Sequence, residues 1–427
     1  MVDSTVGPAT RRVAVDEAHD HKRANDDGTE HERDRGAILA RPLLTMDRLG
    51  RTDGRTGDAV KQDDIEAVAY LTCLGKKPSE IQNLLGCSQP QVSRLVRAAE
   101  QELGYFRTIH QSLLTDEQED RVRKRFFPVS DELSRRWPDV REIVVLPHNQ
   151  FSRGAAMYVK RILDHARRAA LAAGARINLG VAWGDTLGGM VRELMAITKP
   201  DERQGTEPTG ADALRFFPVC GGLLEGPLAR VSPSMLTAEL SRLFNLSTDG
   251  ILDLSTVPAV IPHPTADDPA ANPTGSIREG LLAYCRCVPS FRTIFLGPEA
   301  LHAQANGLLT SVGPSQPHSE WNKQCLKYAG IPEEPLRQST WGDIAGAFLP
   351  KEGKESQVEE WADRFLTISL RDIARCARRA MPSSLGEKPS GLYPGVIVLA
   401  QHDDLAEVLD AALGSRLVNV LILDEIL

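Results

Sequence analysis

Polar side chains able to contact nucleic acid recur between residues 88 and 97. In the run SQPQVSRLVR, Val92, Leu95 and Val96 have the three- and four-residue spacing of one buried helix face. The opposite face then carries Gln89, Gln91, Ser93, Arg94 and Arg97. Amides can pair with adenine, and arginines with guanine or with phosphate. These side chains are therefore predicted to contact DNA, together with Lys77, Ser88 and Arg107.

Two short helices would position that polar face. Apolar residues of the preceding segment keep the same helical spacing at Ile81, Leu84 and Leu85. Pro78 suits a first helical turn, Gly86 suits the left-handed end of a helix, and Ser88 can cap a second helix. The pattern predicts a helix-turn-helix, with a β-prone run around Arg107 as its wing. The alternative is an ordinary helical hairpin with a solvated polar face.

A second kind of chemistry is indicated where an apolar run ends at Trp183. Gly184 turns the chain there, and Asp185 and Thr186 begin a helix. Free amides at a helix start, together with a hydroxyl, favour a bound anion such as phosphate. The alternative is that Asp185 only caps the helix.

Further loops of the same kind follow other apolar runs. Gly221 and Gly222 follow FFPVC, and Gly313 lies in SVGPS. Asp343, in WGDIAG, could accept hydrogen bonds from sugar hydroxyls. The alternatives are a tight turn for the glycines and a helix cap for Asp343. We expect these loops to form one effector site with Gly184, Asp185 and Thr186.

Short apolar runs alternate with amphipathic segments after residue 142, which indicates an α/β fold. Strands are predicted at 143–146, 177–183, 216–219, 259–261, 293–296, 308–312, 396–399 and 418–423. Helices are predicted at 153–173, 187–196, 234–244 and 405–413. Buried strands in such alternation predict a doubly wound, mostly parallel sheet. Its ligand crevice would lie at the carboxyl ends of the strands.

The 427 residues suit more than one domain. We expect a flexible tail at 1–60, a helix-turn-helix domain at 61–110, a helical linker at 111–137 and an effector domain at 138–427. With 41% hydrophobic residues, the chain as a whole is not disordered. The net charge of −8 argues against nonspecific coating of nucleic acid. The basic face is small, so oligomerisation is expected to supply enough phosphate contacts.

Composition also bears on cofactors and on compartment. The seven cysteines form no C-x-x-C pair, and we expect reduced thiols with no metal site. No cofactor is expected. No apolar run approaches membrane-spanning length, and the N-terminus lacks a signal-type segment. The protein is therefore expected to be cytoplasmic, with no membrane partner.

The order of these motifs resembles a known family. A helix-turn-helix followed by GVAWGDTL, FFPVCGGL, WGDIAGAF and LVNVLILDE is similar to the SorC/DeoR type of bacterial sugar-responsive transcription regulators. The resemblance runs from about Asp63 to Leu427. It implies a ribose-5-phosphate isomerase-like effector domain, tetramers or dimers, and a phosphorylated sugar as effector. It also implies that Gly184, Asp185 and Thr186 hold phosphate and that Asp343 is an acidic site residue.

One departure from that family bears on the effector. The family has a late A-G-G-x-x-K segment whose lysine meets the sugar phosphate, and LAQHDDL at 399–405 has neither the glycines nor the lysine. The expected function is a sequence-specific DNA-binding regulator, modulated by a small carbohydrate that carries phosphate. The alternatives are a sugar-phosphate isomerase- or deaminase-like enzyme and a regulator that has lost effector binding. No spacing singles out a catalytic acid–base pair.

Overall fold

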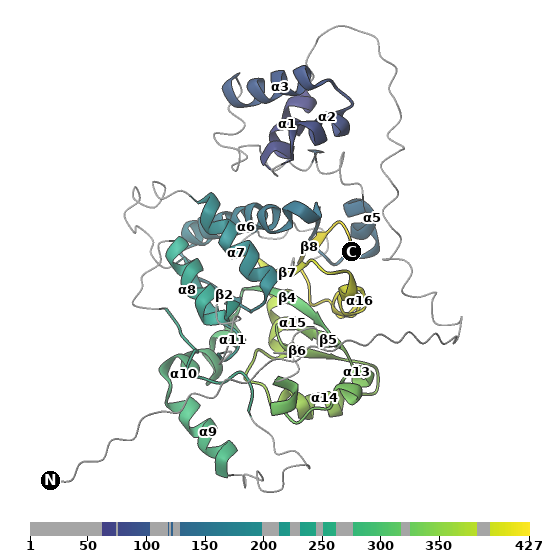
Figure 1. Ribbon diagram of the computed structural model, residues 1–427. Helices are drawn as coiled ribbons and strands as arrows, with labels where there is room; N and C mark the ends of the chain where they lie inside the picture. Colours follow the sequence, from purple (N-terminus) through teal and green to yellow (C-terminus); the bar gives the residue numbers. More distant parts are fainter. Residues whose placement is uncertain are drawn as a thin grey trace, which may run out of the picture.

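The computed structural model describes residues 62–73, 76–102, 118, 121–122, 129–198, 213–222, 231–244, 251–261, 276–316, 325–381 and 393–427. They form a small helical unit and a larger α/β unit (Figure 1). The predicted tail at 1–60 and Arg107 with its predicted wing lie outside the described residues, as does most of the predicted linker.

The helical unit has the expected helix-turn-helix. Helices α1 (Gln62–Cys73), α2 (Pro78–Leu85) and α3 (Gln89–Arg97) pack together, and α3 continues as the π-helical turn η1 (Ala98–Glu102). Their contacts bury Val68, Ile81 and Val92. Gly86 ends α2 with a φ of 64°, a left-handed conformation that suits glycine. Ser88 is the N-cap of α3, as predicted.

The α/β unit is built on a parallel sheet with the strand order β1-β8-β7-β4-β2-β3. These strands are β1 (Glu142–Leu146), β2 (Ile177–Val181), β3 (Leu214–Pro218), β4 (Gly307–Pro314), β7 (Gly395–Ala400) and β8 (Val420–Asp424). An antiparallel hairpin of β5 (Thr340–Ile344) and β6 (Ala347–Pro350) extends from the end of β4. The predicted mostly parallel α/β fold is therefore confirmed.

Helices lie against both faces of this sheet (Figure 1). Helices α6 (Phe151–Ala173) and α7 (Asp185–Ile197) pack against each other, and α11 (Leu301–Gln304) packs against α15 (Leu370–Arg379). The central strand β7 is buried along its whole length because it is covered twice. The remaining helices are α5 (Val129–Arg136), η2 (His148–Gln150), α8 (Pro233–Leu243), α9 (Ser276–Cys287), α10 (Pro289–Phe295), α13 (Glu333–Ser339), α14 (Glu355–Ala362), η7 (Asp403–Leu405) and α16 (Ala406–Gly414). No helix in the described ranges has the length and apolar character that crossing a membrane requires.

Two of the predicted strands are wrong. Residues 293–296 fall mainly in α10, whose first residue is Pro289 and whose buried residues Phe291 and Ile294 are three apart, a helical spacing. Residues 259–261 contribute only an isolated bridge between Val260 and Phe365. The interpretation of Asp343 as a helix cap is also wrong, because it lies in β5 of the hairpin.

Candidate functional site

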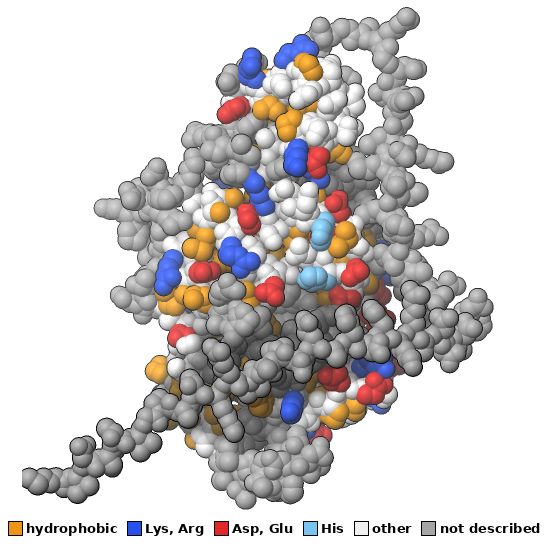
Figure 2. All heavy atoms as spheres, viewed as in Figure 1, with side chains coloured by type: hydrophobic (Ala, Val, Ile, Leu, Met, Phe, Trp, Pro, Cys, Tyr) orange, Lys and Arg blue, Asp and Glu red, His pale blue; other side chains and the backbone are white. Residues whose placement is uncertain are grey.

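The exposed face of α3 is the candidate DNA interface. Val92 and Leu95 are buried beneath it. Exposed residues at the start of α2 and along α3 are the predicted set Lys77, Ser88, Gln89, Gln91, Ser93, Arg94 and Arg97. Lys and Arg side chains gather at this outer end of the molecule (Figure 2). Every described member of the predicted DNA-binding set is therefore exposed on α3 or at the start of α2.

Two members of that set also stabilise the start of α3. The Gln91 side-chain oxygen accepts hydrogen bonds from the Ser88 backbone N–H at 2.7 Å and from the Ser88 hydroxyl at 2.8 Å. This is a capping interaction, which satisfies an otherwise unpaired donor at a helix start. The Gln91 amide nitrogen remains able to donate to a base. Arg94 and Arg97 have no ion pair to any other described residue.

A buried carboxylate ties α1 to the segment that follows the helix-turn-helix. Glu66 is only 2% exposed, and its oxygens accept hydrogen bonds from Gln118 and Arg121, each at 2.9 Å. The sequence did not reveal this contact, because an acidic residue on a helix is usually solvated. A buried charge needs such partners. Glu66 therefore joins the helical unit to Arg121, which is 55 residues away in the chain.

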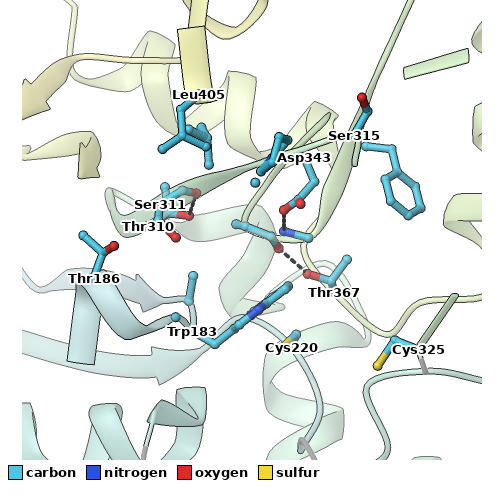
Figure 3. Close-up of a pocket in the computed structure, with 18 of the residues that line it drawn as sticks. Trp183, Thr186, Cys220, Thr310, Ser311, Ser315, Cys325, Asp343, Thr367 and Leu405 are labelled. Carbon is cyan, nitrogen blue, oxygen red and sulfur yellow. Dashed lines mark hydrogen bonds between the residues drawn. The ribbon is translucent and has the colours of Figure 1, made fainter. Parts of the chain in front are cut away.

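The candidate effector site is a cavity of about 240 Å³ at the carboxyl ends of β2, β4 and β7, closed on one side by the β5–β6 hairpin (Figure 3). The predicted residues Gly184, Asp185, Thr186, Gly313 and Asp343 all line it. They come from loops far apart in the sequence. They meet because parallel strands end at the same edge of the sheet.

The start of α7 forms one wall of the cavity. Gly184 is its N-cap with a φ of 127°, and Asp185 is the first helical residue rather than the cap. A Cβ atom added at Gly184 would lie 3.2 Å from the Ser311 hydroxyl, so the loop after β2 closely approaches β4. Thr186 follows in the first turn and also faces the cavity (Figure 3).

Asp343 is the most constrained charged group of the site. Its Oδ1 accepts a hydrogen bond from the Gly346 backbone N–H at 2.8 Å. A Cβ atom at Gly313 would lie 2.5 Å from Oδ2, so only glycine leaves room for the carboxylate. Burial raises the pKa of Asp343 to about 6, although the hydrogen bond from Gly346 opposes the rise. The cavity thus holds a carboxylate that is costly to ionise.

The turn of the hairpin supports an aromatic wall. Ala345 and Gly346 both have positive φ, 55° and 77°, as in the tight two-residue turns of β-hairpins. A Cβ atom at Gly346 would lie 2.2 Å from the Trp183 ring, so the indole packs directly on the turn. The Thr367 hydroxyl donates to the Ala345 carbonyl at 2.7 Å and holds the turn from the other side. Trp183, Asp343 and Thr367 therefore face one space (Figure 3).

Several lining residues were not found from the sequence. They are Cys220, Ala259, Thr310, Ser315, Cys325, Leu326, Leu336, Phe348, Phe365, Thr367, His402, Asp404 and Leu405, among others. Many belong to residues 325–367, which pack around a second apolar cluster that includes Ile331 and Trp361. Burial raises the pKa of the Cys325 thiol to about 12 and raises the pKa of the Cys220 thiol well above its usual value. Neither thiol is a thiolate nucleophile at neutral pH.

Gly221 and Gly222 do not line the cavity. A Cβ atom at Gly221 would lie 2.3 Å from the Pro258 carbonyl oxygen, and one at Gly222 would lie 2.6 Å from that of Ser255. The two glycines therefore allow close packing of two backbone segments, which is their structural alternative. Cys220, the residue before them, does reach the cavity.

The charge of the cavity is acidic. The described lining includes the carboxylates of Asp185, Asp343 and Asp404, with His402 as its one basic side chain and no lysine or arginine. The segment 399–405, where the family resemblance places a lysine, supplies His402, Asp404 and Leu405. The described lining therefore lacks the cationic lysine or arginine side chain that proteins usually use to bind a phosphate.

No family model matches this chain, and no curated protein does either. Solved structures do resemble it. The full-length sorbitol operon regulator SorC of Klebsiella pneumoniae is 16% identical, with a TM-score of 0.43 over 85% of this chain and 97% of that one. A transcriptional regulator from Streptococcus pneumoniae is 17% identical, with a TM-score of 0.43 over 70% of this chain and 93% of that one.

A DeoR family transcriptional regulator from Listeria monocytogenes is 15% identical, with a TM-score of 0.40 over 70% of this chain and 96% of that one. All three of these solved structures are transcriptional regulators, one of them named SorC and one of the DeoR family.

Proposed function

We propose that the protein is a sequence-specific DNA-binding transcriptional regulator whose affinity for its operator changes when a small carbohydrate occupies the cavity. The observation that carries the proposal is the solvent face of α3. Its arginines and amides lie outward over buried Val92 and Leu95. A helix of this kind at the second position of a helix-turn-helix can enter the major groove.

The cavity supports the carbohydrate part of the proposal. It combines an aromatic ring, Trp183, with the Asp343 carboxylate and the hydroxyls of Thr186 and Thr367. Sugar hydroxyls can donate to a carboxylate and to hydroxyl oxygens, and the apolar face of a sugar can pack on an aromatic ring. A cavity of about 240 Å³ is smaller than that of a drug-sized ligand and suits a single sugar unit.

Oligomerisation links the two sites in this proposal. The helix-turn-helix of one copy carries Lys76, Lys77, Arg94 and Arg97, while Glu80 and Glu100 reduce its net positive charge. A single copy therefore neutralises few phosphates and binds weakly. A dimer or tetramer presents paired α3 helices whose separation must match the operator half-sites. A sugar that favours one quaternary arrangement changes that separation and hence the affinity for DNA.

The DNA side is tested with Arg94→Ala, measured by gel shift or fluorescence anisotropy on DNA from upstream of the gene itself. We expect a loss of roughly 1 to 3 kcal/mol, about 5- to 150-fold in Kd, if Arg94 contacts a base. Arg168→Ala is the matched control, because Arg168 is an exposed arginine on α6. Equal Kd values for wild type and Arg94→Ala would remove Arg94 from the interface.

The effector side is tested with Thr186→Ala. This variant should lose the response of DNA binding to sugar and keep DNA binding itself. Thr293→Ala is the matched control, because Thr293 is an exposed threonine on α10, outside the cavity lining. Loss of both properties in Thr186→Ala would show that the loop is structural. Sugar recovered after incubation with the wild type should be chemically unchanged, and its turnover would support the enzyme alternative.

A further inference from the structure

We infer that the cavity takes an uncharged polyhydroxylated ligand, a sugar or alditol without a phosphate group. The inference rests on the proposed function, which it narrows to one class of effector. It departs from the phosphorylated sugar that the family resemblance implies.

The first observation is the balance of charge. The described lining carries the carboxylates of Asp185, Asp343 and Asp404. A phosphate monoester brings close to two negative charges at pH 7, and proteins usually hold it with arginine, lysine or free backbone amides. His402 is the one basic side chain in the described lining, and it is exposed. A dianion would therefore be repelled by more groups than attract it.

The second observation concerns the start of α7, whose residues Asp185 and Thr186 line the cavity. An anion at such a helix start is stabilised by free N–H groups and by the helix dipole. Asp185 stands at the first helical position and already places a negative charge there. The carboxylate therefore satisfies the positive end of the helix, and a phosphate in the same place would meet that charge.

The third observation is Asp343. The carboxylate is held by the Gly346 N–H at 2.8 Å and has no described cation among its hydrogen-bond partners. Gly313 keeps the space beside Oδ2 free of a side chain. A hydroxyl donor entering from the cavity would stabilise this carboxylate, whereas a second anion would raise its ionisation cost further. A neutral polyol supplies such donors.

The walls favour the same class of ligand. Trp183, Phe348 and Phe365 give the cavity an apolar side. The Thr367 hydroxyl donates to the Ala345 carbonyl, so its oxygen is left as an acceptor for a ligand hydroxyl. Apolar surface combined with many acceptors suits a ligand that is rich in hydroxyl donors.

The test uses the full-length protein and matched pairs of probes: glucose, fructose, ribose and glucitol, each beside its terminal monophosphate. Isothermal titration calorimetry measures the affinity for every member, with inorganic phosphate as a further probe. We expect saturable binding by at least one neutral member that is tighter than binding of its phosphate. Tighter binding of a phosphate than of its neutral partner overturns the inference.

Absence of binding by every neutral member up to its solubility limit overturns the inference as well. Operator binding in the gel shift is independent of these results, so the regulator function can stand when the effector class fails.

A charge-reversal pair tests the cause. Asp404→Lys adds a cation to the lining, and Asp403→Lys makes the same change one residue earlier, at an exposed position outside the lining. We expect Asp404→Lys to raise the affinity for the phosphate probes about tenfold and Asp403→Lys to leave it unchanged. Equal gains in both variants, or no gain in either, would contradict the argument from charge.

Discussion

The Asp343 carboxylate is retained at a cost in stability. Its pKa is about 6 in the folded protein, against 3.8 for an ordinary aspartate. Because the pKa of Asp343 is higher in the folded protein than in the unfolded chain, folding favours the protonated carboxyl. Protonation of Asp343 therefore adds to the free energy of unfolding in full below about pH 3.8, and this contribution is lost as the pH rises through 6. Such a group is expected where it serves a ligand rather than the fold.

Asp343→Asn should therefore stabilise the ligand-free protein at pH 7.5, because asparagine can keep the Gly346 hydrogen bond without a charge. The raised pKa of Asp343 limits the gain in the free energy of unfolding to about 3 kcal/mol, and solvent screening reduces that gain to roughly 1 to 2 kcal/mol. Denaturant unfolding at pH 4 and pH 7.5 measures the gain, which should shrink at the lower pH. The same variant should bind sugar more weakly. A variant less stable than wild type at pH 7.5 contradicts this account.

His302 has the opposite pH dependence. It is 6% exposed in α11, its ring meets that of Phe295 edge-on at 4.1 Å, and its Nε2 has no hydrogen-bond partner among the described residues. Burial lowers its pKa to about 4 from 6.5. The neutral ring is thus favoured in the folded state. Stability is lost as the pH falls from 6.5 to 4, by up to about 3 kcal/mol.

His302→Phe should remove that loss, because a phenyl ring keeps the aromatic packing and cannot take up a proton. The unfolding free energy of the wild type minus that of the variant should therefore be lower at pH 4.5 than at pH 6.5. Protonation of Asp343 stabilises both proteins over the same pH interval, and subtracting one unfolding free energy from the other removes this shared effect. A difference that does not change with pH would show that His302 is not protonated on unfolding.

At the scale of elements, the β5–β6 turn positions both Asp343 and Trp183. Gly346 has a φ of 77° and lies against the Trp183 ring, while Gly353 has a φ of 75° with nothing within 4 Å of an added Cβ. Gly346→Ala and Gly353→Ala share the same backbone strain of about 1 to 2 kcal/mol. Gly346→Ala should additionally displace the indole and lose sugar binding. Thermal unfolding and calorimetry compare the pair, and equal sugar affinity in both variants contradicts the role given to Trp183.

The elements that the sequence predicted well are those with one dominant cause. The central strands are short and wholly apolar, and α2 and α3 have both the helical spacing and the residues Gly86 and Ser88 at the turn. The hairpin was not predicted, because Ala345 adopts a left-handed φ of 55° that alanine does not signal. The strand predicted at 293–296 is a helix, because the Phe291 and Ile294 spacing outweighs β propensity.

At the scale of the molecule, the sequence located the edge of the sheet but not the whole cavity. Gly184, Asp185, Thr186, Gly313 and Asp343 meet there, as parallel topology requires. The wall from residues 325–367 could not be predicted, because it depends on how a separate apolar cluster packs. The hydrogen bonds of Glu66 with Gln118 and Arg121 are likewise a tertiary contact without a local pattern.

Operator binding by the full-length protein, with and without sugar, measures the coupling between the cavity and the DNA-binding face of α3. DNA from upstream of the gene and a scrambled duplex of equal length are titrated by fluorescence anisotropy, each with and without the neutral sugar that binds in calorimetry. The account predicts salt-dependent binding that prefers the native duplex and whose Kd shifts with the sugar, by about 5- to 150-fold for a typical coupling. Equal affinity for both duplexes, or a Kd that saturating sugar leaves unchanged, would contradict it.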